Sequence, residues 1–332
     1  MKILLNEMEC EICLILPYFG KFNEYFNLWL KSCKYNNKID WYIYTDDRGF
    51  YEYPKNVIVN YCNFVDIQKR AFDLFGNDIK LDKPYDLCKF RVAYHKLFPE
   101  VINKYHYWGY CDCDLIWGDL YSAISPALKK EYNKISWRGH FTLFKNSNEI
   151  NELFQYKTPG NKTFEDCILK KNEINLFDEV GINRVFDYLN KPIYKDLLFA
   201  DLKVKPFNFV CSHFSDSQEF KNKNQIFEWN KGKLYRIYIC NGCVCKEEFS
   251  YIHFLRREMK YLIKRDSEHY LIVPNKFIDY QDLTASQIIN LSKRRFYWRY
   301  YKKRLTPQYI LKVLQHKIRK AKTPDIYPFI IK

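Results

Sequence analysis

Glycine and proline are scarce in this sequence, with 10 and 12 residues respectively among 332. Their scarcity argues against a collagen-like, linker-rich or propeller-type chain. Long hydrophobic runs are also missing, because the longest clean apolar run, Ile12 to Phe19, is far short of the roughly 20 residues that span a bilayer. The apolar stretch at the N-terminus is too short, and the residues after it too acidic, for a secretory signal. We therefore expect a cytoplasmic chain, or one that contacts a membrane at its surface.

Several common catalytic motifs are absent as well. The sequence has no Gly-x-Gly-x-x-Gly fingerprint, no P-loop and no serine nucleophile elbow, so dinucleotide redox chemistry and P-loop kinase chemistry have no support.

The 12 cysteines are scattered along a chain without an export signal, and we interpret them as reduced thiols. Cys240, Cys243 and Cys245 have a spacing that could hold part of a metal site. No second pair of ligands is near them in the sequence, however, and Asn241-Gly242 between apolar runs is typical of a hairpin turn.

Hydrophobic residues make up 47% of the chain and charged residues 28%, which is enough apolar surface for one large α/β domain or two smaller ones. The apolar run over 11–19 predicts a buried strand. Apolar residues over 22–33 then recur at three- and four-residue steps, as on one face of a helix, and 41–45 and 57–59 predict two further strands. This order of strand, helix and strand predicts the start of a parallel sheet.

The rest of the body continues the alternation of helices and strands. A helix is expected after Pro84, and an aromatic strand over 105–111 follows it. Asp112 and Asp114 stand at the C-terminal end of this strand, which is the edge where open α/β sheets bind ligands. We further expect helices around 164–172 and 181–189, strands over 134–137, 140–144 and 207–211, and a hairpin over 233–240 and 243–250.

The net charge of +15 is concentrated near the C-terminus, since residues 281–332 hold 13 lysines and arginines against two acidic residues. Cations and aromatic side chains alternate over 293–304. After Pro307 a basic amphipathic helix is expected, with cations on its polar side at Lys312, Lys317, Arg319 and Lys320. Such a stretch suits an anionic membrane surface, whereas nucleic acid and a solvated basic face packed on the body are the alternatives. We predict a body over 1–260 and a basic, aromatic, helical region over 261–332 that contacts a membrane surface, with no nucleic-acid partner.

Asp112 and Asp114 are the sharpest candidates for chemistry. Carboxylates two residues apart point to opposite faces of a strand, but in a turn just past the strand end both can converge on one divalent cation. Their hard oxygen atoms suit Mg²⁺ or Mn²⁺, with water and substrate phosphates in the remaining positions. A metal held in this way neutralises a diphosphate leaving group. The alternative is a pair of solvated loop acids.

Seven segments of the chain carry a family resemblance. In chain order they are LILPYFGKFNEYFNLWLKSC, YTDD, PYDLCKFRVAYHKLF, YHYWGYCDCDLIWGDL, GHFTLFKN, LFDEVGI and YIHFLRREM. Together these segments resemble a bacterial family of GT-A-like glycosyltransferases that contain a DxD motif and are encoded in capsule and O-antigen polysaccharide clusters. The resemblance covers about residues 10–260.

The resemblance implies a GT-A-like α/β body with a Rossmann-like mixed sheet, a nucleotide-diphosphate sugar donor with UDP the foremost nucleotide, and Mn²⁺ or Mg²⁺ on Asp112 and Asp114. It also implies an acceptor that is a glycan or a lipid-linked oligosaccharide of capsule or lipopolysaccharide biosynthesis, met in the cytoplasm or at the inner membrane surface. The implied nucleotide pocket lies at the ends of the first two strands, at Leu16, Pro17, Tyr18, Thr45, Asp46 and Asp47.

One departure from the family pattern concerns the segment after Pro84. This chain has Cys88-Lys89-Phe90 where the family has Cys-Asp-Phe. Because the acid is replaced by a cation, Lys89 and Arg91 could approach phosphates in this pocket instead.

A late histidine completes the metal shell of glycogenin-like and related retaining transferases, and His253 occupies the comparable place in this chain. An imidazole ligand favours Mn²⁺ over Mg²⁺. Arg256 and Arg257 follow closely and could clamp the diphosphate. The alternative is a strand-end histidine bonded to a backbone carbonyl, followed by two surface arginines.

His140 and the pair Asp178-Glu179 are candidates for the catalytic side of the site. A carboxylate there could orient donor hydroxyls or, in an inverting enzyme, deprotonate the acceptor hydroxyl. Helix capping before Ile182 is the alternative for the two acids, since acids favour a first helical turn. Two further acids are weaker candidates, Asp166 and Asp201.

These observations lead to one expected function and two alternatives. We expect a metal-dependent glycosyltransferase that moves a sugar from a nucleotide donor to a glycan hydroxyl. A metal-dependent nucleotidyltransferase or phosphodiesterase would use the same two acids. A non-catalytic nucleic-acid-binding protein would act through residues 293–304.

Overall fold

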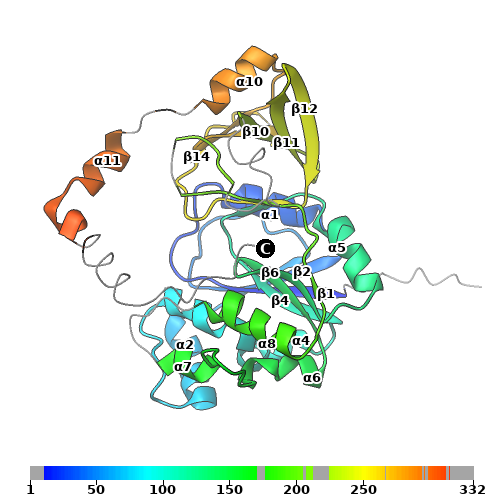
Figure 1. Cartoon of the computed structure of the whole chain (residues 1–332), viewed down its shortest axis with the longest axis vertical. Helices are drawn as coiled ribbons and strands as arrows, with labels where there is room; N and C mark the ends of the chain where they lie inside the picture. The colour runs from blue at the N-terminus through cyan, green and yellow to red at the C-terminus, as the bar shows by residue number, and fades with distance from the viewer. Residues whose placement is uncertain are drawn as a thin grey trace, which may run out of the picture.

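The computed structural model describes residues 11–169, 176–204, 207–211, 224–265, 267–293, 295, 298–311 and 314. Within these residues the chain is a mixed α/β protein with β-sheets of seven, six and three strands (Figure 1). The α/β class expected from the alternating pattern is therefore confirmed. No helix in this part of the chain is both long and apolar enough to span a bilayer.

The seven-stranded sheet is built on the parallel strands that the apolar runs predict. Its strands in spatial order are β3 (Val57–Tyr61), β2 (Ile39–Thr45), β1 (Ile12–Pro17), β4 (Tyr107–Cys111), β7 (Phe141–Lys145), β6 (Lys134–Arg138) and β8 (Ile193–Tyr194). β1 to β4 are parallel, whereas β7 is antiparallel to both of its neighbours. Ile15 of β1 pairs with Tyr42 on one side and Tyr110 on the other, so the carboxyl ends of β1, β2 and β4 meet at one edge.

Helices cover both faces of this sheet, which explains why β1 is apolar along its whole length. Ile12, Leu14 and Leu16 pack with α1 (Phe26–Lys34) and α5 (Leu120–Lys129). Cys13 and Ile15 belong to the opposite core, whose helices are α2 (Phe64–Phe75), α3 (Tyr94–Leu97), α4 (Pro99–Ile102), α6 (Asn148–Asn151), α7 (Phe164–Leu169) and α8 (Ile182–Tyr188). Figure 1 has α1 and α5 on one side of the sheet and α2, α7 and α8 on the other.

The segment after Pro84 folds differently from the single helix that is predicted. Pro84–Ala93 is a 3₁₀-helix, and α3 follows it for one turn. The buried residues Leu87, Phe90 and Ala93 stand three residues apart, which is the period of a 3₁₀-helix rather than that of an α-helix.

The helices expected around 164–172 and 181–189 correspond to α7 and α8, with a π-helix over Phe177–Gly181 leading into α8. Residues 170–172 lie outside the described residues.

The six-stranded sheet contains the predicted hairpin and four further strands. In spatial order it consists of β12 (Cys243–Phe249), β11 (Lys233–Cys240), β10 (Gln225–Asn230), β15 (His269–Val273), β16 (Lys276–Asp279) and β14 (Lys260–Tyr261). The expected boundary at residue 260 therefore falls inside a sheet, and the expectation of a helical region is wrong for 261–279. β15 pairs with β10, which lies far from it in the chain, whereas β16 pairs with β15 across a short turn at Pro274 and Asn275.

Helices follow this sheet toward the C-terminus. α10 (Ala285–Ser292) buries Ile288 in a cluster with Ile226 of β10 and Ile237 of β11. α11 (Trp298–Arg304) comes next. Several of the basic and aromatic residues singled out in the sequence lie outside the described residues: Arg294, Phe296, Tyr297, Lys312, Lys317, Arg319 and Lys320.

A three-stranded sheet of β5 (Leu115–Trp117), β13 (Tyr251–His253) and β9 (Ala200–Asp201) joins distant parts of the chain. β13 lies in its centre, with His253 opposite the first residue of β5 and the last residue of β9. The strand expected over 207–211 forms instead a single bridge between Leu202 and Cys211. This small sheet brings Asp201 and His253 to the end of β4.

Candidate metal and ligand site

A cavity of about 1980 Å³ lies at the carboxyl ends of β1 and β4 and is lined from both larger sheets. Its floor carries Asp112 and Asp114, in the turn between β4 and β5. The amide of Asp112 donates to the carbonyl of His140 at 3.0 Å, and the amide of Phe254 donates to the carbonyl of Asp114 at 2.9 Å. These backbone bonds hold the turn, so that both acids line the same cavity.

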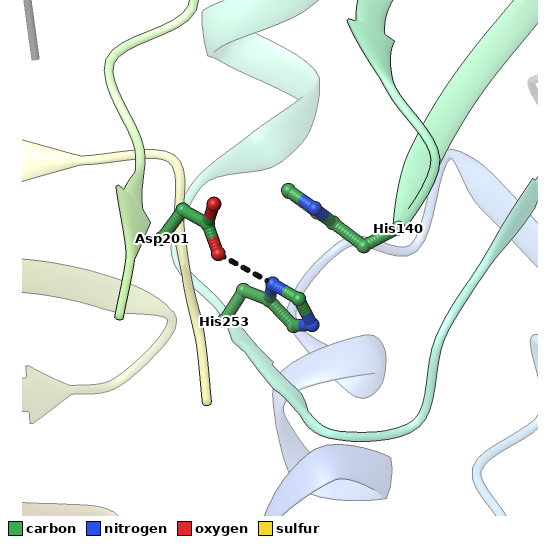
Figure 2. Close-up of side chains that lie close together, drawn as sticks. All are labelled: His140, Asp201 and His253. Carbon is green, nitrogen blue, oxygen red and sulfur yellow. Dashed lines mark hydrogen bonds and ion pairs between the residues drawn. The ribbon is translucent and has the colours of Figure 1, made fainter. Parts of the chain in front are cut away.

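His253 reaches this floor from β13 and is held there by Asp201 (Figure 2). Its Nδ1 lies 2.8 Å from Oδ1 of Asp201, and its Nε2 lies 3.3 Å from Oδ1 of Asp114. The ring of His140 stacks on that of His253 with centroids 4.1 Å apart, and Nε2 of His140 lies 3.2 Å from the Tyr251 hydroxyl. These contacts fix the rotation of the His253 ring, with one nitrogen turned toward the cavity floor.

The three residues predicted as metal ligands lie close together. One candidate ligand atom from each of Asp112, Asp114 and His253 lies within 4.8 Å of the others. Two carboxylate oxygens and an imidazole nitrogen form a donor set that Mn²⁺ or Mg²⁺ accepts. A metal-bound histidine also usually donates a hydrogen bond from its other ring nitrogen to a carboxylate, as His253 does to Asp201. The residues present therefore fit a divalent cation.

A second group of candidate ligands shares one residue with the first. His140, Asp201 and His253 also lie within 4.8 Å of one another, but all three are buried. Asp201 contacts Nδ1 of His253, the nitrogen on the side away from Asp114. We therefore interpret His140 and Asp201 as the support of His253, and not as the catalytic group that the sequence suggested for His140.

The backbone beyond β13 closes around Asp114. The amide of Arg256 donates to Oδ2 of Asp114 at 2.8 Å. Leu255 and Arg256 have φ values of 48° and 58°, a region that residues other than glycine rarely adopt. Such strain persists where the surrounding structure fixes it, and here it directs an amide at a candidate ligand. The Arg256 guanidinium lies over the ring of Tyr85, 5.5 Å from its centroid, at the cavity wall.

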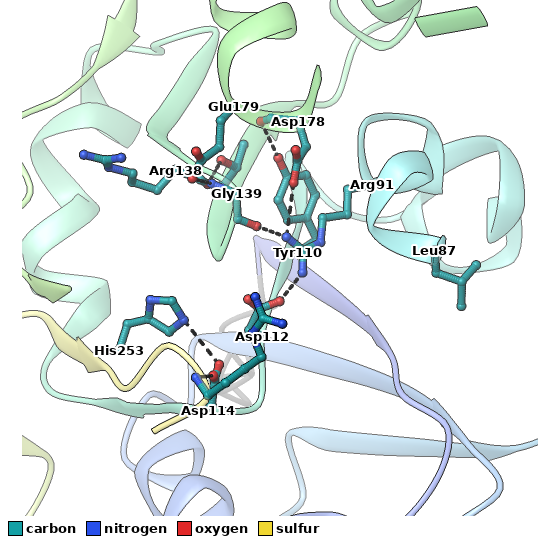
Figure 3. A network of polar contacts seen from close by, with 12 residues as sticks. Leu87, Arg91, Tyr110, Asp112, Asp114, Arg138, Gly139, Asp178, Glu179 and His253 are labelled. Carbon is teal, nitrogen blue, oxygen red and sulfur yellow. Dashed lines mark hydrogen bonds and ion pairs between the residues drawn. The ribbon is translucent and has the colours of Figure 1, made fainter. Parts of the chain in front are cut away.

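Arg91 links the floor to a second acidic pair, Asp178 and Glu179 (Figure 3). Its guanidinium forms ion pairs with Asp112 and, at 3.1 Å, with Oδ2 of Asp178, and it donates to the carbonyl of Gly139 at 2.5 Å. The amide of Gly139 donates to Oε1 of Glu179 at 2.8 Å. The side chains of the two acids thus hold the arginine and the loop before β7, rather than capping α8.

Burial shifts the pKa of two carboxyl groups upward in this network. It raises the pKa of Asp112 to about 6 and that of Asp178 to about 6, in each case against the opposing effect of the Arg91 charge. Both groups therefore titrate nearer to neutral pH than ordinary aspartates do. Perturbed acids of this kind cluster at functional sites.

Asp114 and His253 form a charged pair. Burial opposes the ionisation of both groups, but the positive charge of His253 and hydrogen bonds to the carboxylate lower the pKa of Asp114 to about 2. In turn Asp114, followed by Asp201, overcomes burial and raises the pKa of His253 to about 10. Burial, and after it the charge of His253, keeps the pKa of His140 well below its ordinary value. These shifts favour a protonated His253 and a neutral His140, and a metal ion that binds Nε2 of His253 would have to displace the proton there.

The residues predicted for a nucleotide pocket divide into two groups. Three of them line the cavity, namely Leu16, Pro17 and Tyr18. The other three do not line it, namely Thr45, Asp46 and Asp47. Asp46 accepts a hydrogen bond from the Gly20 amide at 2.7 Å, and Asp47 accepts one from the Phe22 amide at 2.9 Å. These acids hold the loop that follows β1 and so position the cavity wall indirectly.

The four cations predicted to approach phosphates also differ in position. Three of them, Arg91, Arg256 and Arg257, line the cavity. Lys89 lies outside the cavity wall and pairs with Asp86 at 3.2 Å. The guanidinium of Arg257 is buried and donates to Asn275 at 2.8 Å and to a carbonyl of the 207–211 segment at 3.2 Å. We therefore interpret Arg257 as a residue that ties two loops together, in place of the surface clamp that the sequence suggested.

Two features of the site have little or no signal in the sequence. Asp201 stands in a strand of two residues, and its contact with His253 arises from the pairing of β9 with β13. The sequence marks it as no more than a weak candidate. The sequence suggests Arg91 only as a cation for phosphates, whereas its position between Asp112 and Asp178 depends on the packing of the 3₁₀-helix against the π-helix before α8.

The fold and the site together define an α/β protein with a cluster of carboxylates and a histidine on the floor of a large cavity. Residues 14–281 match the model of a family described as Family of unknown function (DUF6625), and the chain belongs to this family. The matched region extends past residue 260 and contains the whole six-stranded sheet, in agreement with the hydrogen bonding. A comparison with curated proteins finds no match.

Proposed function

We propose that the chain is a metal-dependent glycosyltransferase of the GT-A type, which moves a sugar from a nucleotide-diphosphate donor, UDP foremost, to a hydroxyl of a capsule or lipopolysaccharide glycan. The observation that carries the proposal is the convergence of Asp112, Asp114 and His253 on the floor of the cavity. These side chains come from distant segments and meet at the carboxyl edge of parallel strands, where α/β proteins bind nucleotides. The proposed setting is the cytoplasm, peripheral on the inner membrane.

Three residues of the cavity floor would bind the cation, and two neighbouring residues would hold these ligands in position. Asp112, Asp114 and Nε2 of His253 would be its ligands, with Mn²⁺ favoured over Mg²⁺ because one donor is an imidazole nitrogen. When bound, such an ion neutralises the diphosphate that leaves as the bond to the sugar breaks. Asp201 accepts a hydrogen bond from Nδ1–H of His253 and so keeps Nε2 directed at the floor. Arg91 restrains the Asp112 carboxylate from the other side.

Other lining residues suit the donor. Tyr18 stacks on Phe22 with ring centroids 4.6 Å apart and lines the cavity beside β1, where its ring offers a face to a nucleotide base. Asp178 and Glu179 line the cavity farther along the floor, and carboxylate oxygens accept hydrogen bonds from sugar hydroxyls. The base and the sugar of one donor molecule would thus lie on either side of the cation ligands.

Calorimetric titration of a nucleotide panel tests the proposal. UDP, GDP, CMP and UDP-sugars are titrated, with and without Mn²⁺, into the wild type and into the Asp112→Asn/Asp114→Asn double variant. We expect one nucleotide to bind in a Mn²⁺-dependent manner, and this binding to be lost in the double variant. Asp73→Asn/Asp78→Asn is the matched control, because it removes the same charge from exposed positions outside the cavity.

Two outcomes would contradict the proposal. The first is that folded wild-type protein binds no nucleotide of the panel. The second is metal-dependent hydrolysis of a nucleotide without transfer of a sugar, which would favour a phosphodiesterase that uses the same two acids.

A further inference from the structure

Cations of the C-terminal segment line the same cavity as Asp112 and Asp114. They are Lys293, Arg295, Lys302 and Arg304, and we call them the basic wall. In Figure 1 the chain runs from α10, on the six-stranded sheet, to α11 at the left, outside both larger sheets. The first part of the basic segment, which the sequence suggests as an appendage to the body, thus belongs to the ligand cavity.

The basic wall is attached to the body at several points. The amide of Arg295 donates to the carbonyl of Phe207 at 3.2 Å. The ring of Tyr301 in α11 lies 5.8 Å from that of Phe207. α10, which precedes the wall, is anchored by Ile288, whose side chain is 1% exposed. These contacts hold the cations at the edge of the cavity.

Charges of both signs line this cavity. Its floor carries the carboxylates of Asp112, Asp114, Asp178 and Glu179, which are partly paired with Arg91 and His253. The basic wall, Lys260 and Lys276 add further cations from the C-terminal part of the chain, where Glu258 also lines the cavity. A divalent cation and the diphosphate of a donor would balance each other at the floor. The field of the basic wall would then attract a second anion.

The cavity also has room and apolar surface for a second ligand. Its volume of about 1980 Å³ exceeds the roughly 300–1,000 Å³ of a typical pocket for one small molecule. Val204 and Leu262 line it and are 45% and 48% exposed. A ligand with an apolar portion would remove both side chains from water.

We infer that the basic wall binds the phosphate of an amphiphilic acceptor, that is, a phosphate or diphosphate ester on an apolar chain. The inference rests on the proposed function, because a sugar hydroxyl of this acceptor must reach from the wall to the donor on the floor. Lys293, Arg295 and Lys302 donate charge-assisted hydrogen bonds to the phosphate oxygens. Val204 and Leu262 contact the apolar chain. The C-terminal segment thereby selects the acceptor.

Calorimetry on the full chain with farnesyl diphosphate, a short soluble probe of this chemistry, tests the inference. The Lys293→Gln/Arg295→Gln/Lys302→Gln variant should bind the probe at least about tenfold more weakly than the wild type, since three charge-assisted donors are lost. The same variant should bind UDP with Mn²⁺ within about twofold of the wild-type affinity, because none of the three residues belongs to the proposed cation site.

A matched control separates local binding from the overall charge of the protein. Lys55→Gln/Lys129→Gln/Lys130→Gln removes the same three charges from exposed positions outside the cavity. This control should bind farnesyl diphosphate as the wild type does. An equal loss of affinity in both triple variants would overturn the inference, because the effect would then be one of net charge.

Two further probes identify the kind of anion. Inorganic diphosphate should bind the wild type at least about tenfold more weakly than farnesyl diphosphate, and Leu262→Gln should reduce this difference because it removes apolar contact. Equal affinity for the two probes would overturn the amphiphilic assignment. Phosphatidylglycerol vesicles that displace farnesyl diphosphate would overturn it in favour of a membrane surface.

The remaining outcomes separate this inference from the proposed function. Unchanged farnesyl diphosphate affinity in the wall variant would overturn the inference, as would a parallel loss of UDP binding, which would assign the cations to the donor. If the proposed glycosyltransferase function is wrong, the result is different, because the wild type itself would then bind no nucleotide with Mn²⁺.

Discussion

Nδ1 of His253 lies 2.8 Å from Oδ1 of Asp201, on the side of the imidazole ring away from Asp114. The carboxylate accepts a hydrogen bond from Nδ1–H, and Nε2 is therefore directed toward Asp114 at 3.3 Å. Asp201 thus determines which nitrogen of His253 can bind a cation. The two residues meet through the parallel pairing of β9 with β13.

Removing the Asp201 carboxylate should weaken metal binding although no proposed ligand is lost. Asp201→Asn is expected to lower Mn²⁺ affinity about 10- to 100-fold, and Asp201→Ala to lower it further because no acceptor remains for Nδ1. Titration calorimetry with Mn²⁺ measures the change, and Asp73→Asn at an exposed position is the control. Wild-type Mn²⁺ affinity in Asp201→Ala would exclude this role for Asp201.

Arg91 should contribute more to stability than a surface arginine does. Arg91→Gln leaves the largely buried carboxyl groups of Asp112 and Asp178 without their counter-charge, and we expect the free energy of unfolding to fall by about 3–5 kcal/mol. Urea unfolding followed by circular dichroism measures the loss. Because protonation or removal of one acid relieves the imbalance, Arg91→Gln/Asp178→Asn should recover part of it.

The surface pair of Arg70 and Glu100 provides the comparison for Arg91. Its atoms lie 2.9 Å apart, but the two side chains are 46% and 49% exposed. Arg70→Gln should therefore cost no more than about 1 kcal/mol. Equal losses in Arg70→Gln and Arg91→Gln would contradict the idea that burial makes the Arg91 network important.

Lys134 should make stability rise with pH in the alkaline range. Its Nζ is buried and donates to the Ser136 carbonyl at 2.7 Å and to Asn183 at 2.9 Å. Burial lowers its pKa from 10.5 to about 7. Between these two values the unfolded chain binds a proton that the folded chain lacks, so the free energy of unfolding increases with pH, by up to about 1.4 kcal/mol per pH unit from this residue.

The contribution of Lys134 can be isolated by comparison with Lys134→Met, which has no titrating group at this position. The stability of the wild type relative to the variant should increase between pH 7 and pH 10 in urea unfolding experiments. Below pH 7 the difference should be constant, because both states of the wild type then bind the proton. Parallel profiles across the alkaline range would show that Lys134 keeps its proton in the folded protein.

Gly139 lies where the structure leaves no room for a side chain. A Cβ atom there would lie 2.7 Å from Oδ2 of Asp178 and 3.0 Å from Cγ of Glu179. Gly139→Ala should therefore displace these acids and lower the free energy of unfolding by about 1–3 kcal/mol. Urea unfolding measures the cost, and titration with UDP and Mn²⁺ tests whether the floor is disturbed. Wild-type values in both experiments would mean that the loop can shift without consequence.

Local sequence patterns predict those helices and strands whose burial follows from the order of apolar residues in a short stretch of the chain. β1 is apolar throughout because helices cover both faces of its sheet, and α1 has one apolar face because it packs on one of them. β10, β15 and β16 are not predicted. β10 and β15 pair although they lie far apart in the chain, which no local pattern shows, whereas β15 and β16 form a local hairpin across Pro274 and Asn275 that the sequence analysis does not identify. The segment after Pro84 is predicted as an α-helix but forms a 3₁₀-helix. Over such a short length, apolar residues three and four positions apart fit the periods of both kinds of helix.

The candidate site divides in the same way. Residue type and spacing single out Asp112 and Asp114, and the family resemblance adds His253; metal binding by the three remains a prediction. That these side chains meet, that Asp201 orients His253, that Arg91 lies between Asp112 and Asp178, and that cations of the C-terminal segment line the cavity are all properties of the tertiary structure. The physical reason is that a sequence pattern reports which side chains can be buried and where the chain can turn. The distance between side chains remote in the chain depends on strand pairing and on the packing of every element between them.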